Sequence, residues 1–124
     1  ICLLATGYMA HTALNAVERL ASEGIQVGVI DIFDLSKFNQ QKLNTILSGY
    51  KAVVTMEEGF SGRGGLDSMM FDHLLRSDMD TQMLNIGVEG GYRFEIGERE
   101  VLHEQVGIGI NAIITKVVDL STRL

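Results

Sequence analysis

Apolar residues along this chain alternate between two spacings, which predict strands and helices in turn. Residues 1–6 form a continuous apolar run, as expected for a strand that is buried on both faces of a sheet. Residues 9–23 change to helical spacing, and Gly24 follows where a glycine commonly ends a helix. The spacing predicts an apolar face on this helix that carries Ala10, Ala13, Leu14, Val17, Leu20 and Ala21.

The same alternation continues along the rest of the chain. A second helix is expected after Asn39, which suits the N-cap position, while Phe38 and Leu43 have the spacing of a hydrophobic staple. Further strands are expected at residues 25–32, 52–56 and 83–88. The remaining helices are expected at residues 66–74, 98–106 and 110–124.

Four strands that alternate with helices over short connections predict right-handed crossovers and a mainly parallel sheet. We therefore expect a three-layer α/β/α domain with strand order 2-1-3-4. The simple order 1-2-3-4 is less suitable, because helices must cover both faces of a parallel sheet. With 124 residues, 46% of them hydrophobic, residues 1–124 are expected to form one domain.

Composition and charge exclude several classes of partner. The net charge of −6 argues against nucleic acid, which requires a basic surface, and no apolar run is long enough to span a membrane. The single cysteine, Cys2, lies in the first strand, so we expect an inert core thiol in a cytoplasmic protein. Because the chain opens at Ile1 inside an apolar run, we expect it to be a piece of a longer protein.

Ligands of open parallel sheets bind at the carboxyl ends of the strands, where the strand order reverses. In the expected order this switch point lies between the first and third strands. It is therefore the expected place for a ligand site or an interface. The candidate residues there are Thr6, Gly7, Tyr8, Glu57, Glu58, Gly59, Phe60, Arg63, Gly64 and Gly65.

The glycine-rich segment 62–65 has two interpretations. Backbone amides before a helix bind anions, so this segment could hold a phosphate with Arg63. The known phosphate fingerprints do not match, which favours a tight turn whose glycines let helix and sheet pack closely. Glu57 and Glu58 are adjacent on a strand and point to opposite faces, so we expect one of them to cap a helix or bind across an interface rather than form a catalytic pair.

The other polar residues do not form a recognisable active site. His103 and Glu104 begin like the zinc pattern H-E-x-x-H, but Gly107 stands where the second histidine would be. His73 is expected to be a hydrogen-bonded core residue. The charged residues 98–100 are expected to be a solvated helix start. We therefore expect no catalytic residue and no metal site in this chain.

The order of motifs resembles the C-terminal domain of the transketolase family of thiamine-diphosphate enzymes. The resemblance implies that upstream domains bind thiamine diphosphate and a divalent metal, that the parent enzyme is a homodimer, and that this domain supports assembly. The cofactor signature Gly-Asp-Gly does not occur here, so no cofactor and no activity are expected of this chain alone. The matching segments are 3–9, 23–25, 29–31, 53–59, 64–65, 97–100 and 107–113.

Two departures from the family pattern are visible. Many members have a proline in the turn at 37–39, and many have a histidine where Ile96 precedes Gly97. The resemblance leaves open transketolase, 1-deoxyxylulose-5-phosphate synthase and the β subunit of 2-oxo acid dehydrogenases as parents. The alternatives are an interaction domain of a 2-oxo acid dehydrogenase complex, or a stand-alone module that binds an anion or another small ligand.

Overall fold

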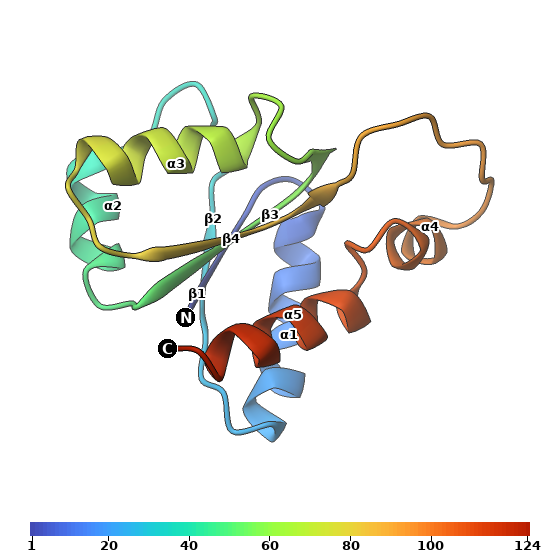
Figure 1. Cartoon of the computed structure of the whole chain (residues 1–124), viewed down its shortest axis with the longest axis horizontal. Coiled ribbons are helices and arrows are strands. Elements are labelled where there is room, and N and C mark those ends of the chain that lie inside the picture. The colour runs from blue at the N-terminus through green and yellow to red at the C-terminus, as the bar shows by residue number, and fades with distance from the viewer.

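The computed structural model describes all 124 residues as four strands and five helices. The sheet has the order β2-β1-β3-β4, and every neighbouring pair is parallel (Figure 1). This confirms the predicted α/β class and strand order, with a sheet that is parallel throughout. The elements are β1 (Cys2–Ala5), α1 (Met9–Ser22), β2 (Gly28–Asp31), α2 (Gln40–Leu47), β3 (Ala52–Phe60), α3 (Leu66–Arg76), β4 (Gln82–Val88), α4 (Arg99–Gln105) and α5 (Ile110–Ser121).

Two apolar cores lie on the two faces of the sheet. Helices α1 and α5 cover one face, and α2 and α3 cover the other (Figure 1). Because side chains alternate along a strand, Leu3 and Ala5 join the first core, whereas Cys2 and Leu4 join the second. Burial raises the pKa of the Cys2 thiol to about 11, which keeps it protonated and unreactive at neutral pH.

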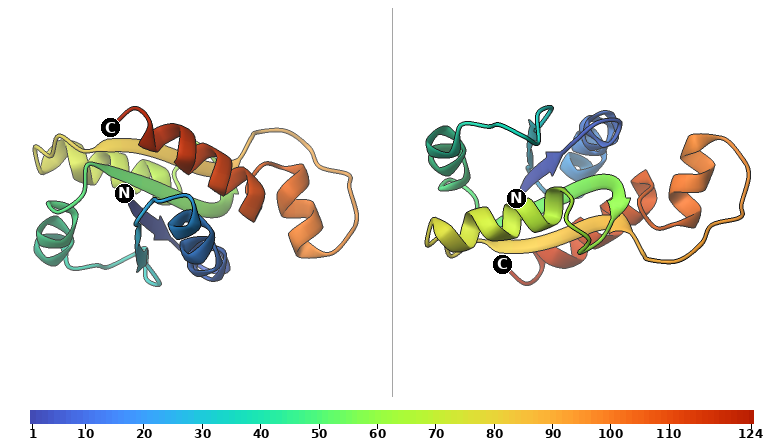
Figure 2. Two further views of the ribbon diagram at one scale, coloured as in Figure 1. Left: turned by 90° about the horizontal axis from the view of Figure 1, so that it is seen from below. Right: turned by 90° about the horizontal axis from the view of Figure 1, so that it is seen from above.

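Helix α4 is placed differently from the other helices. Both views of Figure 2 show α4 and the preceding segment 89–98 extending beyond the carboxyl end of the sheet. Helix α5 then returns along the sheet and packs on the same core as α1. None of the helices combines the length and apolar character needed to cross a membrane.

The end of α1 follows the sequence prediction, but its buried face differs. Gly24 has a φ of +78°, and the N–H of Ile25 donates to the carbonyl of Leu20, which closes the helix as a Schellman motif. Leu14 and Ala21, predicted on the apolar face, are exposed. The residues of α1 that are buried against the sheet and α5 are instead Met9, Thr12, Ala13, Ala16 and Leu20.

The N-terminus of α2 has the predicted cap. The side-chain Oδ1 of Asn39 accepts a hydrogen bond of 2.9 Å from the backbone N–H of Lys42. Phe38 and Leu43 both pack in the core under α2 and α3, as a hydrophobic staple requires. The cap and the staple together fix the point where the chain enters α2.

Strand β3 continues four residues beyond its predicted end at Met56. Phe60 pairs with Val88 of β4 after a shift of register between Met56 and Phe60. The acidic pair Glu57 and Glu58 therefore belongs to the strand rather than to the loop that follows. Its side chains keep the alternation of a strand.

His73 is a core residue, as predicted, but it lacks the expected hydrogen bond at one nitrogen. Its side chain is buried on α3, and its ring meets the ring of Phe38 edge-on with centroids 5.6 Å apart. The buried Nε2 atom has no hydrogen-bond partner. Burial lowers the pKa of His73 below its ordinary value of 6.5, although the neighbouring Asp72 acts in the opposite direction.

This burial predicts a pH-dependent stability. The unfolded chain binds a proton at His73 more readily than the folded chain, so the free energy of unfolding should fall as pH drops below about 6.5. His73→Leu should flatten this part of the profile, whereas His11→Leu, a change at an exposed histidine, should leave it in place. Urea unfolding from about pH 7.5 to about pH 5 measures the effect. An unchanged slope in His73→Leu would contradict the assignment.

Candidate functional site at the carboxyl edge of the sheet

The carboxyl ends of β1 and β3 lie next to each other, as the strand order requires. The backbone N–H of Thr6 donates to the carbonyl of Met56, and the Thr6 hydroxyl donates to the carbonyl of Ile32 at 2.8 Å. Gly7 follows with a φ of +58°, which turns the chain so that α1 begins after Tyr8. Thr6 and Gly7 are thus structural residues that join three strands at the switch point.

Glu57 points from β3 towards α3 and stabilises the start of that helix. Its carboxylate is buried, and Oε1 accepts a hydrogen bond of 3.1 Å from the backbone N–H of Asp67. A side chain at Gly65 would collide with this carboxylate, and one at Gly59 would approach it within 2.7 Å. These two glycines therefore make room for Glu57. Of the two roles expected for this pair, capping a helix or binding across an interface, Glu57 takes the first.

A second carboxylate closes the glycine-rich loop. Asp67 accepts a hydrogen bond of 2.5 Å from the N–H of Gly62, while the N–H of Gly64 donates to the hydroxyl of Ser68 at 3.0 Å. The amides of Gly62, Gly64 and Asp67, which could otherwise help to hold a phosphate, are thus bound by the chain's own oxygens. An incoming anion would meet the charge of Glu57, so the geometry supports the tight-turn interpretation of this loop.

Glu58 points to the opposite face and meets α4. Its Oε1 lies 2.8 Å from Nε2 of His103 and 3.4 Å from Nε of Arg99. The guanidinium of Arg99 also lies 4.4 Å above the ring centre of Tyr8, and the Tyr8 hydroxyl donates to Oε1 of Glu100. We call these five residues, Tyr8, Glu58, Arg99, Glu100 and His103, the α4 cluster.

The hydrogen bond between Tyr8 and Glu100 changes the acidity of both groups. It raises the pKa of the Tyr8 phenol above its ordinary value and lowers the pKa of the Glu100 carboxyl below its own. At neutral pH the phenol therefore keeps its proton and Glu100 is ionised. The bonds from Arg99 and His103 to Glu58, and from Tyr8 to Glu100, join α4 to the edge of the sheet.

The α4 cluster adds contacts that the sequence analysis does not predict. Residues 98–100 are exposed, as expected of a solvated helix start, yet Arg99 and Glu100 also contact Glu58 and Tyr8. His103, where the zinc pattern is incomplete, is a buried partner of Glu58. Helical spacing places Arg99 and His103 on one face of α4, but it does not indicate what that face contacts.

The remaining predicted site residues do not take part in the α4 cluster. Phe60 is about half exposed, at 48%, and Arg63 is exposed on the loop that leads to α3. The rings that lie near Tyr8 are instead those of His11 and His103. The structure thus divides the candidate residues between the α3 side and the α4 side of one edge. No three acidic, histidine or cysteine side chains in the chain are grouped as metal ligands.

The geometry predicts which contact holds α4. His103 is buried and its partner is charged, so His103→Ala should lower the free energy of unfolding by about 2 to 3 kcal/mol. The side chain of Arg99 is 54% exposed, so Arg99→Ala should cost about 1 kcal/mol or less. Urea unfolding of the two variants of α4 gives the comparison. A larger loss in Arg99→Ala would show that the cation, rather than the buried histidine, holds the helix.

Comparison with known proteins assigns this architecture to a family. The family described as "Transketolase, C-terminal domain" matches residues 1–113. The 1-deoxy-D-xylulose-5-phosphate synthase of Aquifex aeolicus is 30% identical over 117 residues, which cover 94% of this chain and 18% of that protein. The synthase of Chlamydia muridarum is 29% identical over the same shares.

A solved structure agrees with the sequence relatives. A split-gene transketolase, described as an inactive β4 tetramer, superimposes with a TM-score of 0.80 at 27% identity. The match covers 95% of this chain and 37% of that one. The chain therefore spans less than a fifth of the length of the synthases that it matches and little more than a third of the transketolase chain. It belongs to the transketolase C-terminal domain family.

Proposed function

We propose that this chain is the C-terminal assembly domain of a larger thiamine-diphosphate-dependent enzyme of the transketolase type, which transfers two-carbon ketol units. The observation that carries the proposal is the alignment of nearly the whole chain with less than a fifth of each synthase. In this proposal the cofactor and the reaction belong to the upstream domains. The buried, unreactive Cys2 thiol supports a cytoplasmic location.

Neither the glycine-rich start of α3 nor the α4 cluster fits the diphosphate group of the cofactor. A diphosphate would require the free amides of a helix start, and the glycine-rich start of α3 is bound by Glu57 and closed by Asp67. The carboxylates of the α4 cluster are likewise bound to His103, Arg99 and Tyr8. The chain therefore supplies contacts to the proposed enzyme rather than chemistry.

An assembly domain needs an apolar surface that a partner covers, and the segment 89–98 provides one. Its side chains Tyr92, Phe94 and Ile96 are 90%, 86% and 99% exposed. The rings of Tyr92 and Phe94 are stacked with centroids 6.2 Å apart. Aromatic groups of this kind are enriched where proteins meet. We assign this segment, with Tyr8 and Phe60 at the same edge, to contact with the upstream thiamine-diphosphate-binding domains of a homodimeric enzyme.

A binding measurement tests the proposal that the cofactor binds to the upstream domains and not to this chain. The isolated chain, titrated calorimetrically with thiamine diphosphate and Mg²⁺, should give no heat of binding in the micromolar range. The complete enzyme from the same gene should bind and serves as the control. A dissociation constant of about 1 µM for the isolated chain, which corresponds to about −8 kcal/mol, would contradict the proposal.

A double substitution tests the assembly role directly. Phe60→Ala with Arg63→Ala should leave the melting temperature of the isolated domain nearly unchanged, because Arg63 is exposed and Phe60 is about half exposed. The same pair should weaken assembly of the complete enzyme by a few kcal/mol, the scale of an interface hot spot. Analytical ultracentrifugation measures assembly, with Leu14→Ala on an exposed face of α1 as control. If the double variant unfolds as an isolated domain but the complete enzyme still assembles, the two side chains belong to the core and not to an interface.

A further inference from the structure

A hollow lies between β2, α2 and the connection that joins them. In Figure 1 this connection, residues 32–39, rises beyond the carboxyl end of β2 before the chain enters α2. The hollow has a volume of about 440 Å³, and none of its lining residues belongs to the α4 cluster or to the start of α3. Its apolar lining consists of Ile30, Ile32, Phe33, Phe38, Leu43 and Ile46.

The size and the lining of this hollow are those of a small-molecule site. Such sites measure about 300 to 1,000 Å³ and combine apolar walls with a few polar groups. The lining residues Ile32 and Leu43 are buried, whereas Phe33 and Ile46 are 89% and 39% exposed. A ligand with an apolar body would cover apolar side chains that the chain itself leaves in water.

The folded chain forms the walls of the hollow before any ligand arrives. Asn39 caps α2 and Phe38 packs in the core, so the chain enters the helix at a fixed point. Lys42 and Ile46 follow one turn apart and therefore share the face of α2 that lines the hollow. Walls that are already in place spare a ligand much of the cost of ordering them.

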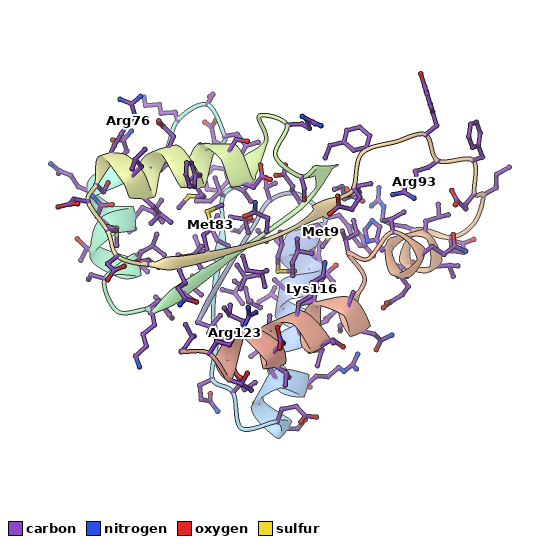
Figure 3. All side chains as sticks on the ribbon, in the orientation of Figure 1. Met9, Arg76, Met83, Arg93, Lys116 and Arg123 are labelled. Carbon is purple, nitrogen blue, oxygen red and sulfur yellow. The ribbon has the colours of Figure 1, made fainter.

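Two lysines that line the hollow, Lys37 and Lys42, have no partner for their ammonium groups. The chain has ten Lys and Arg residues, and seven of them bond through the side chain to another part of the chain. Arg76, for example, projects from the outer side of α3 in Figure 3 and pairs with Asp72. The third residue without a partner is Arg63. Two of the three unpartnered cations thus lie beside one apolar hollow.

The acidic residues of the hollow do not balance this positive charge. The Asp34 carboxylate accepts hydrogen bonds from the N–H and the hydroxyl of Ser36, at 2.9 and 2.6 Å, and these bonds hold its pKa below the ordinary value of 3.8. Asp31 is exposed and has no partner. The first turn of α2 adds partial positive charge, because the N–H groups of Gln40 and Gln41 make no hydrogen bond within the chain. An anion is therefore the complementary ligand.

We propose that this hollow binds a small amphiphilic anion, with its apolar body against Ile32 and Leu43 and a carboxylate or phosphate head at Lys37 and Lys42. A lysine ammonium is a compact charge on a flexible stem, so it accepts either head group. The chain as a whole carries a net charge of −6, so the attraction of an anion is a local property of this hollow. The site is separate from the contacts with upstream domains, and its occupation does not depend on them.

Titration calorimetry of the chain with probes that differ only in the head group tests the proposal. Octanoate should bind saturably with a dissociation constant below about 1 mM, 1-octanol should bind more weakly, and octylamine should bind most weakly. Added salt should weaken octanoate and leave 1-octanol unchanged, because salt screens the charges alone. Octyl phosphate in the same titration identifies which of the two anionic heads the lysines prefer.

Substitutions separate the head of the ligand from its body. Lys37→Ala with Lys42→Ala should raise the dissociation constant of octanoate about tenfold and leave that of 1-octanol unchanged. Ile46→Gln should weaken both probes, because it removes part of the apolar wall. Lys51→Ala, at an exposed lysine outside the hollow, is the control and should change neither. Circular dichroism verifies that each variant is folded.

Amide shifts in the nuclear magnetic resonance spectrum locate the bound probe. On titration with octanoate, the shifts should be confined to residues 30–46. Tighter binding of octylamine than of octanoate, or full octanoate affinity in the double lysine variant, would overturn the proposal. A lack of saturable octanoate binding would overturn it as well. None of these results would affect the cofactor titration, which tests the proposed function independently.

Discussion

Two adjacent carboxylates at the end of β3 attach helices α3 and α4 to one edge of the sheet. The alternation of the strand sends Glu57 towards α3 and Glu58 towards α4. Glu57 is buried, where a charged hydrogen bond contributes about 1.5 to 3 kcal/mol and its loss leaves a costly unpaired group. Glu58 is partly exposed, so its bond to buried His103 matters more than its longer contact with Arg99.

The glycine-rich loop is best understood from the position of Glu57. A carboxylate that lies under the start of a helix needs room, and Gly59 and Gly65 provide it because neither has a side chain. Asp67 then bonds the amide of Gly62 and closes the turn. A loop that resembles a phosphate cradle in its sequence thus surrounds an anion that the chain carries itself. At the switch point, the usual ligand site of such sheets, the chain's own carboxylates therefore take the place of a ligand.

The surfaces available to partners lie outside the switch point. The segment 89–98 extends beyond the sheet with Tyr92, Phe94 and Ile96 in solvent, and it is followed by α4, which the α4 cluster holds in place. The edge of β4 lies elsewhere on the sheet, and this strand has no neighbouring strand on its outer side.

The sequence by itself determined the alternation of strands and helices, the strand order, the caps at Asn39 and Gly24, and the family. These features depend on local spacing and on chain connectivity, and both can be read from the order of the residues. The sequence did not indicate that β3 continues to Phe60, that α1 is turned to expose Leu14, or that Arg99 and His103 bind Glu58. Each of these depends on residues distant in the chain: the register against β4, the packing of α5 on α1, and the position of α4 beyond the sheet. Only the folded chain brings those partners within the few ångströms over which hydrogen bonds and side-chain packing act.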